Sequence, residues 1–309
     1  MTPAAALAPL PAAPPAAALE HGLVRAADGE PLYYHVYGRG TPLLLHQGLV
    51  SGGCHWPFFI DHFRRDYRVV SWEYRGHAGA PTPRDPRTID IEHFAADGHA
   101  VAAQLAPGGA IVAGLSFGVQ VALEHYRAYP DDVRALVLIC GTYGHPLDRI
   151  SPAPALRRGA AALARGFGGL GPLGRLALRV FKTELPHTIT YLVGGAHREL
   201  CPRRILDALF DHVARIDPRV FGEAFHSYFE HSAEDMLSTI RVPTLIIAGD
   251  QDQLTPASVA ERMQAQIPGA RLVVFPGHTH LVQVERPQAV HAVVESFLAD
   301  VGLAPVLTA

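Results

Sequence analysis

The sequence predicts an α/β protein with a mostly parallel, doubly wound sheet and a helical cap insertion. Short, continuous apolar segments alternate with helix-period segments up to about residue 143, and this alternation returns at residue 242. Continuous apolar strands are typical of a parallel sheet that helices cover on both faces. From about Gly144 to Ser238 no segment has a convincing strand pattern, and glycine and proline interrupt the chain often. We expect this stretch to be a cap over the carboxyl edge of the sheet, where open α/β sheets bind ligands.

The predicted elements follow one another in a regular order. Two strand-like segments, His21–Ala26 and Pro31–Tyr37, open the fold, and the Asp28-Gly29 pair between them favours a hairpin turn. The later predicted strands are Pro42–His46, Tyr67–Trp72, Ala110–Leu115, Val133–Cys140, Val242–Ala248 and Arg271–Phe275. The predicted helices are Trp56–Arg64, Ile89–Leu105, Phe117–Tyr129, Ser258–Gln266 and Pro287–Ala299. We therefore divide the chain into an N-terminal arm (1–19), a core (20–143 and 239–301) and a cap (144–238).

Composition and charge exclude several classes of protein. The chain has 309 residues and a formal net charge of −3, so it lacks the basic excess that nucleic-acid-binding proteins usually carry. No apolar run reaches the length of a transmembrane helix. The three cysteines, at positions 54, 140 and 201, are odd in number and widely spaced, which argues against a disulfide framework or a thiolate zinc site.

The first 19 residues are almost only alanine, proline and leucine. They lack the positive amino-terminal region and the unbroken apolar core of a signal peptide, and their prolines oppose a helix. We expect a disordered arm on a cytoplasmic protein, although export by another route stays open.

A G-x-S-x-G pentapeptide, Gly114–Gly118, lies between a predicted strand and a predicted helix. A serine in such a tight strand-to-helix turn adopts a strained backbone, and its hydroxyl projects above the edge of the sheet. The amino end of the next helix also offers positive potential to a developing oxyanion. This context favours Ser116 as a nucleophile over a chance match in a glycine- and alanine-rich chain.

A nucleophilic serine needs a base, and the base needs an acid that orients it. Asp250 and Asp252 follow one predicted strand, and His278 and His280 follow the next. All four therefore lie at the same sheet edge as Ser116. A lone acid or histidine after a strand is more often a turn residue, but the order serine, acid, histidine matches a hydrolytic triad.

These motifs resemble the α/β-hydrolase superfamily, and specifically its capped, esterase-like branch, over about Leu32–Ala299. In that family the acid often stands in G-x-x-D-x-x-x-P, which implies Asp252 through Gly249 and Pro256. The family histidine commonly precedes the glutamate of an E-x-P segment by five residues, and Glu285-Arg286-Pro287 then implies His280. The segment Glu73–Ala80 resembles the family's D-x-R-G-x-G-x-S, which is structural there; Glu73, Ala78 and Ala80 depart from it.

The oxyanion loop departs from the family pattern. The family usually has His-Gly after its third strand, whereas this chain has His46-Gln47-Gly48-Leu49. Spacing back from Trp56 aligns Gly48 with the family glycine, so that Gln47 replaces the histidine. The resemblance then implies the backbone N–H groups of Leu49 and Phe117 as the oxyanion donors, and backbone donors survive a change of side chain.

Several weaker signals have structural explanations. Residues 169–174 match G-x-G-x-x-G but follow an alanine-rich helical stretch and contain a proline, so we expect a loop of the cap and no dinucleotide site. His278 and His280 could be half of a metal site, but no third ligand stands at motif spacing. His55 could line a pocket, and we favour a helix-start residue. Six aromatic residues of the insertion could form a substrate wall or the cap's own core: Phe181, Tyr191, Phe221, Phe225, Tyr228 and Phe229.

The expected function is hydrolysis of a small, apolar carboxylic ester through an acyl-enzyme, with no metal or organic cofactor. The same triad could instead act on a lactone, an amide or a carbon–carbon bond, and a non-enzymatic ligand receptor could keep the triad on the same scaffold. Ser116 argues against a dehalogenase or an epoxide hydrolase, because those relatives attack with an aspartate. The sequence predicts neither the acyl length nor the oligomeric state.

Overall fold

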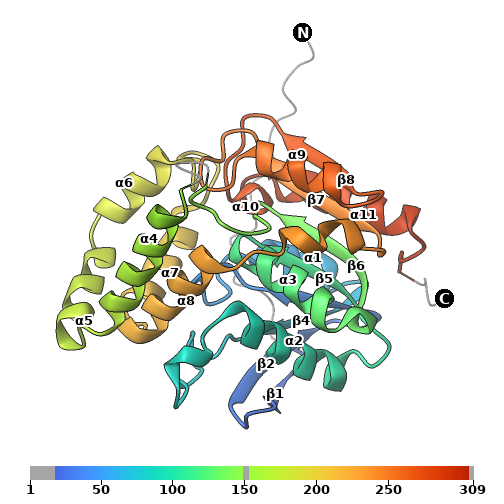
Figure 1. The fold of residues 1–309 in the computed structure, drawn as a ribbon. Helices are drawn as coiled ribbons and strands as arrows, with labels where there is room; N and C mark the ends of the chain where they lie inside the picture. Colours follow the sequence, from blue (N-terminus) through green and yellow to red (C-terminus); the bar gives the residue numbers. More distant parts are fainter. Residues whose placement is uncertain (1–17, 149–152, 306–309) are drawn as a thin grey trace.

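An eight-stranded sheet forms the centre of the molecule, in the order β1-β2-β4-β3-β5-β6-β7-β8 (Figure 1). The structure is a computed structural model and describes residues 18–148 and 153–305. Strand β2 is antiparallel to both of its neighbours, whereas β4, β3, β5, β6, β7 and β8 are mutually parallel. The strands are β1 (Glu20–Arg25), β2 (Pro31–Tyr37), β3 (Thr41–His46), β4 (Tyr67–Trp72), β5 (Ala110–Leu115), β6 (Val133–Ile139), β7 (Thr244–Gly249) and β8 (Arg271–Phe275). The predicted mostly parallel sheet is confirmed.

Helices cover both faces of this sheet. Those of the core are α1 (Pro57–Phe63), α2 (Ile91–Leu105), α3 (Phe117–Ala128), α9 (Ala257–Gln266), α10 (Val282–Glu285) and α11 (Pro287–Asp300). Side chains of α2, α3 and α9 share one apolar cluster, and those of α1 and α11 share another on the opposite face. Strand β3 shows why both faces need cover: Leu44 enters the first cluster, while Leu43 and Leu45 enter the second.

Within the described residues, five α-helices lie between β6 and β7, and we call them the helical insertion. They are α4 (Pro154–Gly168), α5 (Pro172–Leu178), α6 (Leu185–Leu192), α7 (Arg203–Val213) and α8 (Pro218–Glu230). Short 3₁₀-helices complete the chain: η1 (Pro86–Thr88), η2 (Pro130–Asp132), η3 (Arg179–Lys182) and η4 (Glu234–Thr239). The segments that enter and leave the insertion meet at an antiparallel bridge between Gly144 and Ser232, so the insertion begins and ends at one point of the core.

Helices α4 and α8 pack closely because glycines stand at their contact. A Cβ on Gly222 would lie only 2.5 Å from the Ala164 carbonyl oxygen, and one on Gly168 would lie 3.1 Å from the Cα of Arg219. Figure 1 shows the insertion beside the sheet, with α5 and α6 at its outer edge. None of the helices within the described residues is long and apolar enough to cross a membrane.

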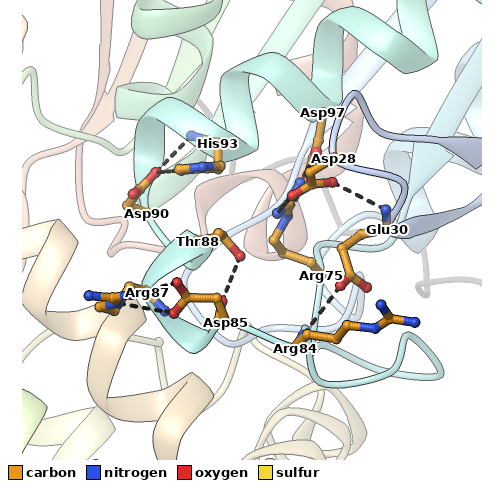
Figure 2. Close-up of polar contacts among 10 residues, drawn as sticks. All are labelled: Asp28, Glu30, Arg75, Arg84, Asp85, Arg87, Thr88, Asp90, His93 and Asp97. Atoms are coloured by element: carbon orange, nitrogen blue, oxygen red, sulfur yellow. Dashed lines mark hydrogen bonds and ion pairs between the residues drawn. The ribbon is translucent and has the colours of Figure 1, made fainter.

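Arg75 ties three separate segments together, as Figure 2 shows. Its guanidinium donates to both carboxylate oxygens of Asp97 in α2, and over 2.7 Å to Asp28 in the β1–β2 turn. Arg75 is 2% exposed and Asp97 is 1% exposed. Burial opposes the charge on Arg75, but the two carboxylates outweigh it and raise the pKa of the guanidinium. The segment Glu73–Ala80 therefore holds the hairpin against α2.

Candidate active site

Ser116 occupies the turn between β5 and α3. Its backbone has φ 56° and ψ −115°, a left-handed conformation that is uncommon for any residue other than glycine. Such strain costs of the order of 1–3 kcal/mol and is found most often at functional sites. From Ala110 to Leu123, Ser116 is the one residue that is not fully buried. The turn therefore presents this serine at the carboxyl edge of the sheet.

The glycines of the pentapeptide allow the turn to form. A Cβ on Gly114 would lie 2.3 Å from the Gly118 carbonyl oxygen. A Cβ on Gly118 would lie 2.4 Å from the carbonyl oxygen of His46 and 2.7 Å from that of Gln47. Glycine at both positions thus lets α3 start against β5 and against the loop that follows β3.

Asp252 and His280 form a buried pair, with 2.7 Å between Asp252 Oδ2 and His280 Nδ1. They are 3% and 7% exposed. The backbone N–H groups of Leu254 and Thr255 donate to Asp252 Oδ1, and the Thr255 hydroxyl donates to Oδ2. These donors hold the carboxylate in place. With Nδ1 donating to Asp252, His280 keeps Nε2 as its acceptor.

The alternative acid and histidine have different roles. Asp250 Oδ1 accepts a hydrogen bond of 2.7 Å from the backbone N–H of Gly277, which links the loops after β7 and β8. His278 Nδ1 lies 2.8 Å from the Pro276 carbonyl oxygen. Both side chains thus bond within turns, and in the described part of the chain neither hydrogen-bonds to Asp252 or His280. Within residues 18–148 and 153–305, no hydrogen bond joins Ser116 to His280.

The loop after β3 contacts the start of α3, as the close approach of Gly118 to His46 and Gln47 shows. Among the described residues, neither the Leu49 nor the Phe117 amide donates a hydrogen bond to another protein group. The Gln47 side chain bonds to Ser71 Oγ and to the Trp72 carbonyl oxygen, at 3.1 and 3.2 Å. The Gln47 side chain therefore supports the loop, and the backbone amides of Leu49 and Phe117 remain available to a ligand.

His55 has an unusual environment. It is 8% exposed, and neither ring nitrogen has a hydrogen-bond partner within the described part of the chain. Burial and the nearby charge of His280 lower its pKa to about 3. Helix α1 begins after Trp56 and takes no cap from His55. Because buried polar atoms are nearly always paired, a neutral His55 is a candidate to hydrogen-bond a bound molecule.

The insertion contacts the loop that carries His280. The backbone N–H of His280 donates to the carbonyl oxygen of Gly194, which follows α6, over 3.0 Å. Glu285 accepts hydrogen bonds from the backbone N–H groups of Thr279 and His197. Thr255, Gly194 and the bonding role of Glu285 are not evident from the sequence motifs, because their partners lie far away along the chain.

The G-x-G-x-x-G match of the sequence lies in the helical insertion. Residues 169–171 form the turn between α4 and α5, and residues 172–174 are the first turn of α5, with no strand before them. Within the residues that the structure describes, no three His, Cys, Asp or Glu side chains are grouped so that they could hold a metal ion. A pocket of about 610 Å³ lies between the Ser51–Cys54 loop and α7.

Comparison with known proteins gives a consistent family. The family model described as the alpha/beta hydrolase fold matches residues 41–287. A non-heme haloperoxidase from Rhodococcus erythropolis is 24% identical over 284 residues, which cover 89% of this chain and 98% of that protein. A putative carbamate hydrolase from Azorhizobium caulinodans is 23% identical over 270 residues, covering 87% of this chain and 96% of that protein.

A solved esterase structure from Exiguobacterium antarcticum superimposes with a TM-score of 0.73 at 19% identity. The superposition covers 90% of this chain and 98% of that chain. A likeness at this level of identity shows that the two proteins share a fold.

Proposed function

The chain belongs to the α/β-hydrolase family, and from this we propose that it hydrolyses carboxylic esters with Ser116, His280 and Asp252 as its catalytic triad. The observation that carries the proposal is the buried Asp252–His280 pair, on loops after β7 and β8, in a sheet whose β5 ends at the strained Ser116 turn. The relatives differ in the activities for which they are named, so the choice of an ester rests on chemistry: an alkoxide leaves more easily than an amine.

The proposed reaction has two halves. Ser116 Oγ attacks the ester carbonyl carbon while His280 Nε2 takes its proton, and the amides of Leu49 and Phe117 stabilise the oxyanion. Collapse breaks the bond to the alkoxide, which receives the proton from His280. His280 then deprotonates water, which attacks the acyl-enzyme and releases the acid and a free Ser116. Asp252 holds the imidazole in the required tautomer throughout.

The helical insertion would act as the lid of this site. The Tyr228 ring of α8 lies 5.8 Å from the ring of Phe117, the residue after Ser116, measured between centroids. Gly194 holds the backbone of His280, so the insertion and the site are mechanically joined. A lid of this kind would exclude water and shape an apolar acyl pocket.

A hydrolysis screen tests the proposal. Purified protein is assayed on p-nitrophenyl esters of graded acyl length, and on lactones and amides, beside Ser116→Ala. We expect turnover of at least one ester and its loss in the variant, with unchanged thermal unfolding. Turnover restricted to lactones or amides would replace the substrate class. No turnover of any substrate, or a tenth of wild-type turnover left in Ser116→Ala, would contradict the proposed function.

A further inference from the structure

The outer side of the insertion exposes a concentration of apolar side chains. Thirteen large hydrophobic residues are exposed within the described chain, and nine of them lie between residues 156 and 192. The nine are Leu156, Leu163, Leu170, Leu173, Leu176, Val180, Leu185, Ile189 and Leu192. Their exposed fractions reach 78% at Leu163 and 72% at Leu192. A concentration of this kind marks an interaction surface more often than single exposed leucines do.

The spacing of these residues places them in three helical stripes. Along α4 and its carboxyl end they recur every seven residues, at 156, 163 and 170. Along α5 and η3 they stand at 173, 176 and 180, and along α6 at 185, 189 and 192. These intervals put each set on one side of its helix. Helix α4 buries Ala161 and Gly168 instead, and packs on α8. The stripes thus face away from the insertion's own core.

Positive charge accompanies the stripes. From Pro154 to Leu192, the span of the three stripes, the chain has six arginine and lysine residues and one acidic residue, Glu184, which pairs with Arg203, although the whole protein is acidic. Arg165 pairs with Glu223, and Arg157 and Arg175 lie near acidic residues of the α8 region. The other three basic residues are exposed and have no partner in the described part of the chain: Arg158, Arg179 and Lys182. We call the nine apolar residues and these three cations the outer face.

We propose that the outer face docks on the surface of an anionic lipid bilayer. Its leucines would enter the boundary between headgroups and acyl chains, and its three unpaired cations would lie at lipid phosphates. Figure 1 places α5 and α6 at the edge of the molecule remote from the sheet, where a flat surface can reach them. The proposal does not depend on the catalytic assignment.

The charge of the outer face favours a bilayer over other occupants. A second copy that met it through a two-fold axis would bring the same cations together, with repulsion between them. A nucleic acid would be held by a continuous basic track, whereas here apolar side chains outnumber the unpaired cations three to one. An apolar stripe along one side of a helix, with basic residues on its polar side, is the pattern of a helix that lies on a membrane.

Vesicle flotation of the full chain tests the proposal. We expect wild type to float with vesicles of phosphatidylglycerol and phosphatidylcholine, less with phosphatidylcholine alone, and less as salt rises, because salt screens the cations. Arg158→Gln/Arg179→Gln/Lys182→Gln should lose about tenfold or more of the binding to anionic vesicles and keep the weak binding to neutral ones. Leu163→Gln/Leu173→Gln/Leu192→Gln should lose about tenfold or more on both.

The matched control is Leu19→Gln/Leu23→Gln, which removes two exposed leucines at β1 and should float like wild type. Circular dichroism checks that each variant is folded. Absence of wild-type flotation, or equal flotation of the leucine variant and the control, would overturn the proposal. The proposal would also be overturned if no protein floated and the wild type instead formed a dimer in sedimentation, or bound duplex DNA, and the leucine or the cation variant abolished that behaviour.

Discussion

At the scale of single residues, Asp250 and Asp252 differ in what their carboxylates contact. Asp252 is buried and accepts from His280 Nδ1, whereas Asp250 is exposed and accepts from the Gly277 amide. The turn after β7 directs the two side chains to opposite partners. The Asp252 carboxylate therefore fixes the tautomer of His280, and the Asp250 carboxylate fixes only the turn.

Asp252→Asn should lower kcat for an ester by about 10⁴-fold, because an amide cannot hold the imidazole in the tautomer that accepts a proton at Nε2. Asp250→Asn is the matched control and should keep kcat within a few-fold of wild type. Steady-state kinetics of both variants measures the difference. A larger loss of kcat in Asp250→Asn than in Asp252→Asn would move the assignment of the triad acid by two residues, to Asp250.

Sequence patterns predict some of these residues and not others. Ser116, Asp252 and His280 stand in motifs with fixed local spacing, so they can be named before the fold is seen. Thr255, Gly194 and the unpartnered nitrogens of His55 cannot, because their importance comes from neighbours far away along the chain. The Leu49 and Phe117 amides remain a prediction, supported by the contact between their segments.

At the scale of elements, the buried Arg75 clamp joins the segment after β4, α2 and the β1–β2 turn. Asp97→Asn should destabilise the protein by about 3–5 kcal/mol, because it leaves the Arg75 charge buried and poorly compensated. Arg87→Gln breaks the exposed Arg87–Asp85 pair of Figure 2 and should leave the unfolding midpoint unchanged. Urea unfolding compares the two. Equal midpoints would show that the clamp adds no stability.

Tyr228 is the insertion residue whose ring reaches Phe117, whereas Phe225 packs against Phe221 and Phe229. Tyr228→Ala should therefore change the preferred acyl length of the ester, by about 10- to 200-fold in relative kcat/KM. Phe225→Ala should shift it less and lower the thermal midpoint more. The two variants are compared on a series of acyl chains. Unchanged selectivity in a folded Tyr228→Ala protein would argue against the lid.

The core strands are predictable because their apolar runs are continuous. Leu43, Leu44 and Leu45 show the reason, since apolar clusters on both faces of the sheet need apolar side chains. The insertion is predictable only as helical. Its packing depends on the contact of Gly168 with α8 and of Gly222 with α4, and glycines in a glycine-rich segment do not indicate which helices touch. The outer face of the insertion is evident only from the exposure of its side chains, because the spacing of apolar residues does not tell which side of a helix is buried.

At the scale of the whole molecule, several buried histidines oppose acid stability. Burial lowers the pKa of His55 and of His291 to about 3, and that of His77 to about 4. In the unfolded chain these groups bind protons below about pH 6.5, whereas in the folded chain they do so only near their lowered values. Stability is therefore full above about pH 6.5 and falls as the pH is lowered toward 4.

At pH 5 each of the two lowest histidines should cost about 2 kcal/mol relative to neutral pH. We expect the free energy of unfolding in urea to drop steeply between pH 6.5 and 4. His291→Phe should flatten this slope, because phenylalanine takes no proton and His291 packs among aromatic rings of α1. His21→Phe, at an exposed site, should leave the slope unchanged. A slope identical in wild type and His291→Phe would contradict the assignment.

The central claim is that Ser116 is the nucleophile, and covalent labelling tests it most directly. The full chain is treated with a fluorophosphonate, which reacts with an activated serine, and the labelled peptide is identified by mass spectrometry. We predict one adduct per chain, on Ser116, with labelling much slower in Asp252→Asn. An adduct on another serine with Ser116 unmodified, or no adduct on a folded protein that hydrolyses esters, would contradict the account.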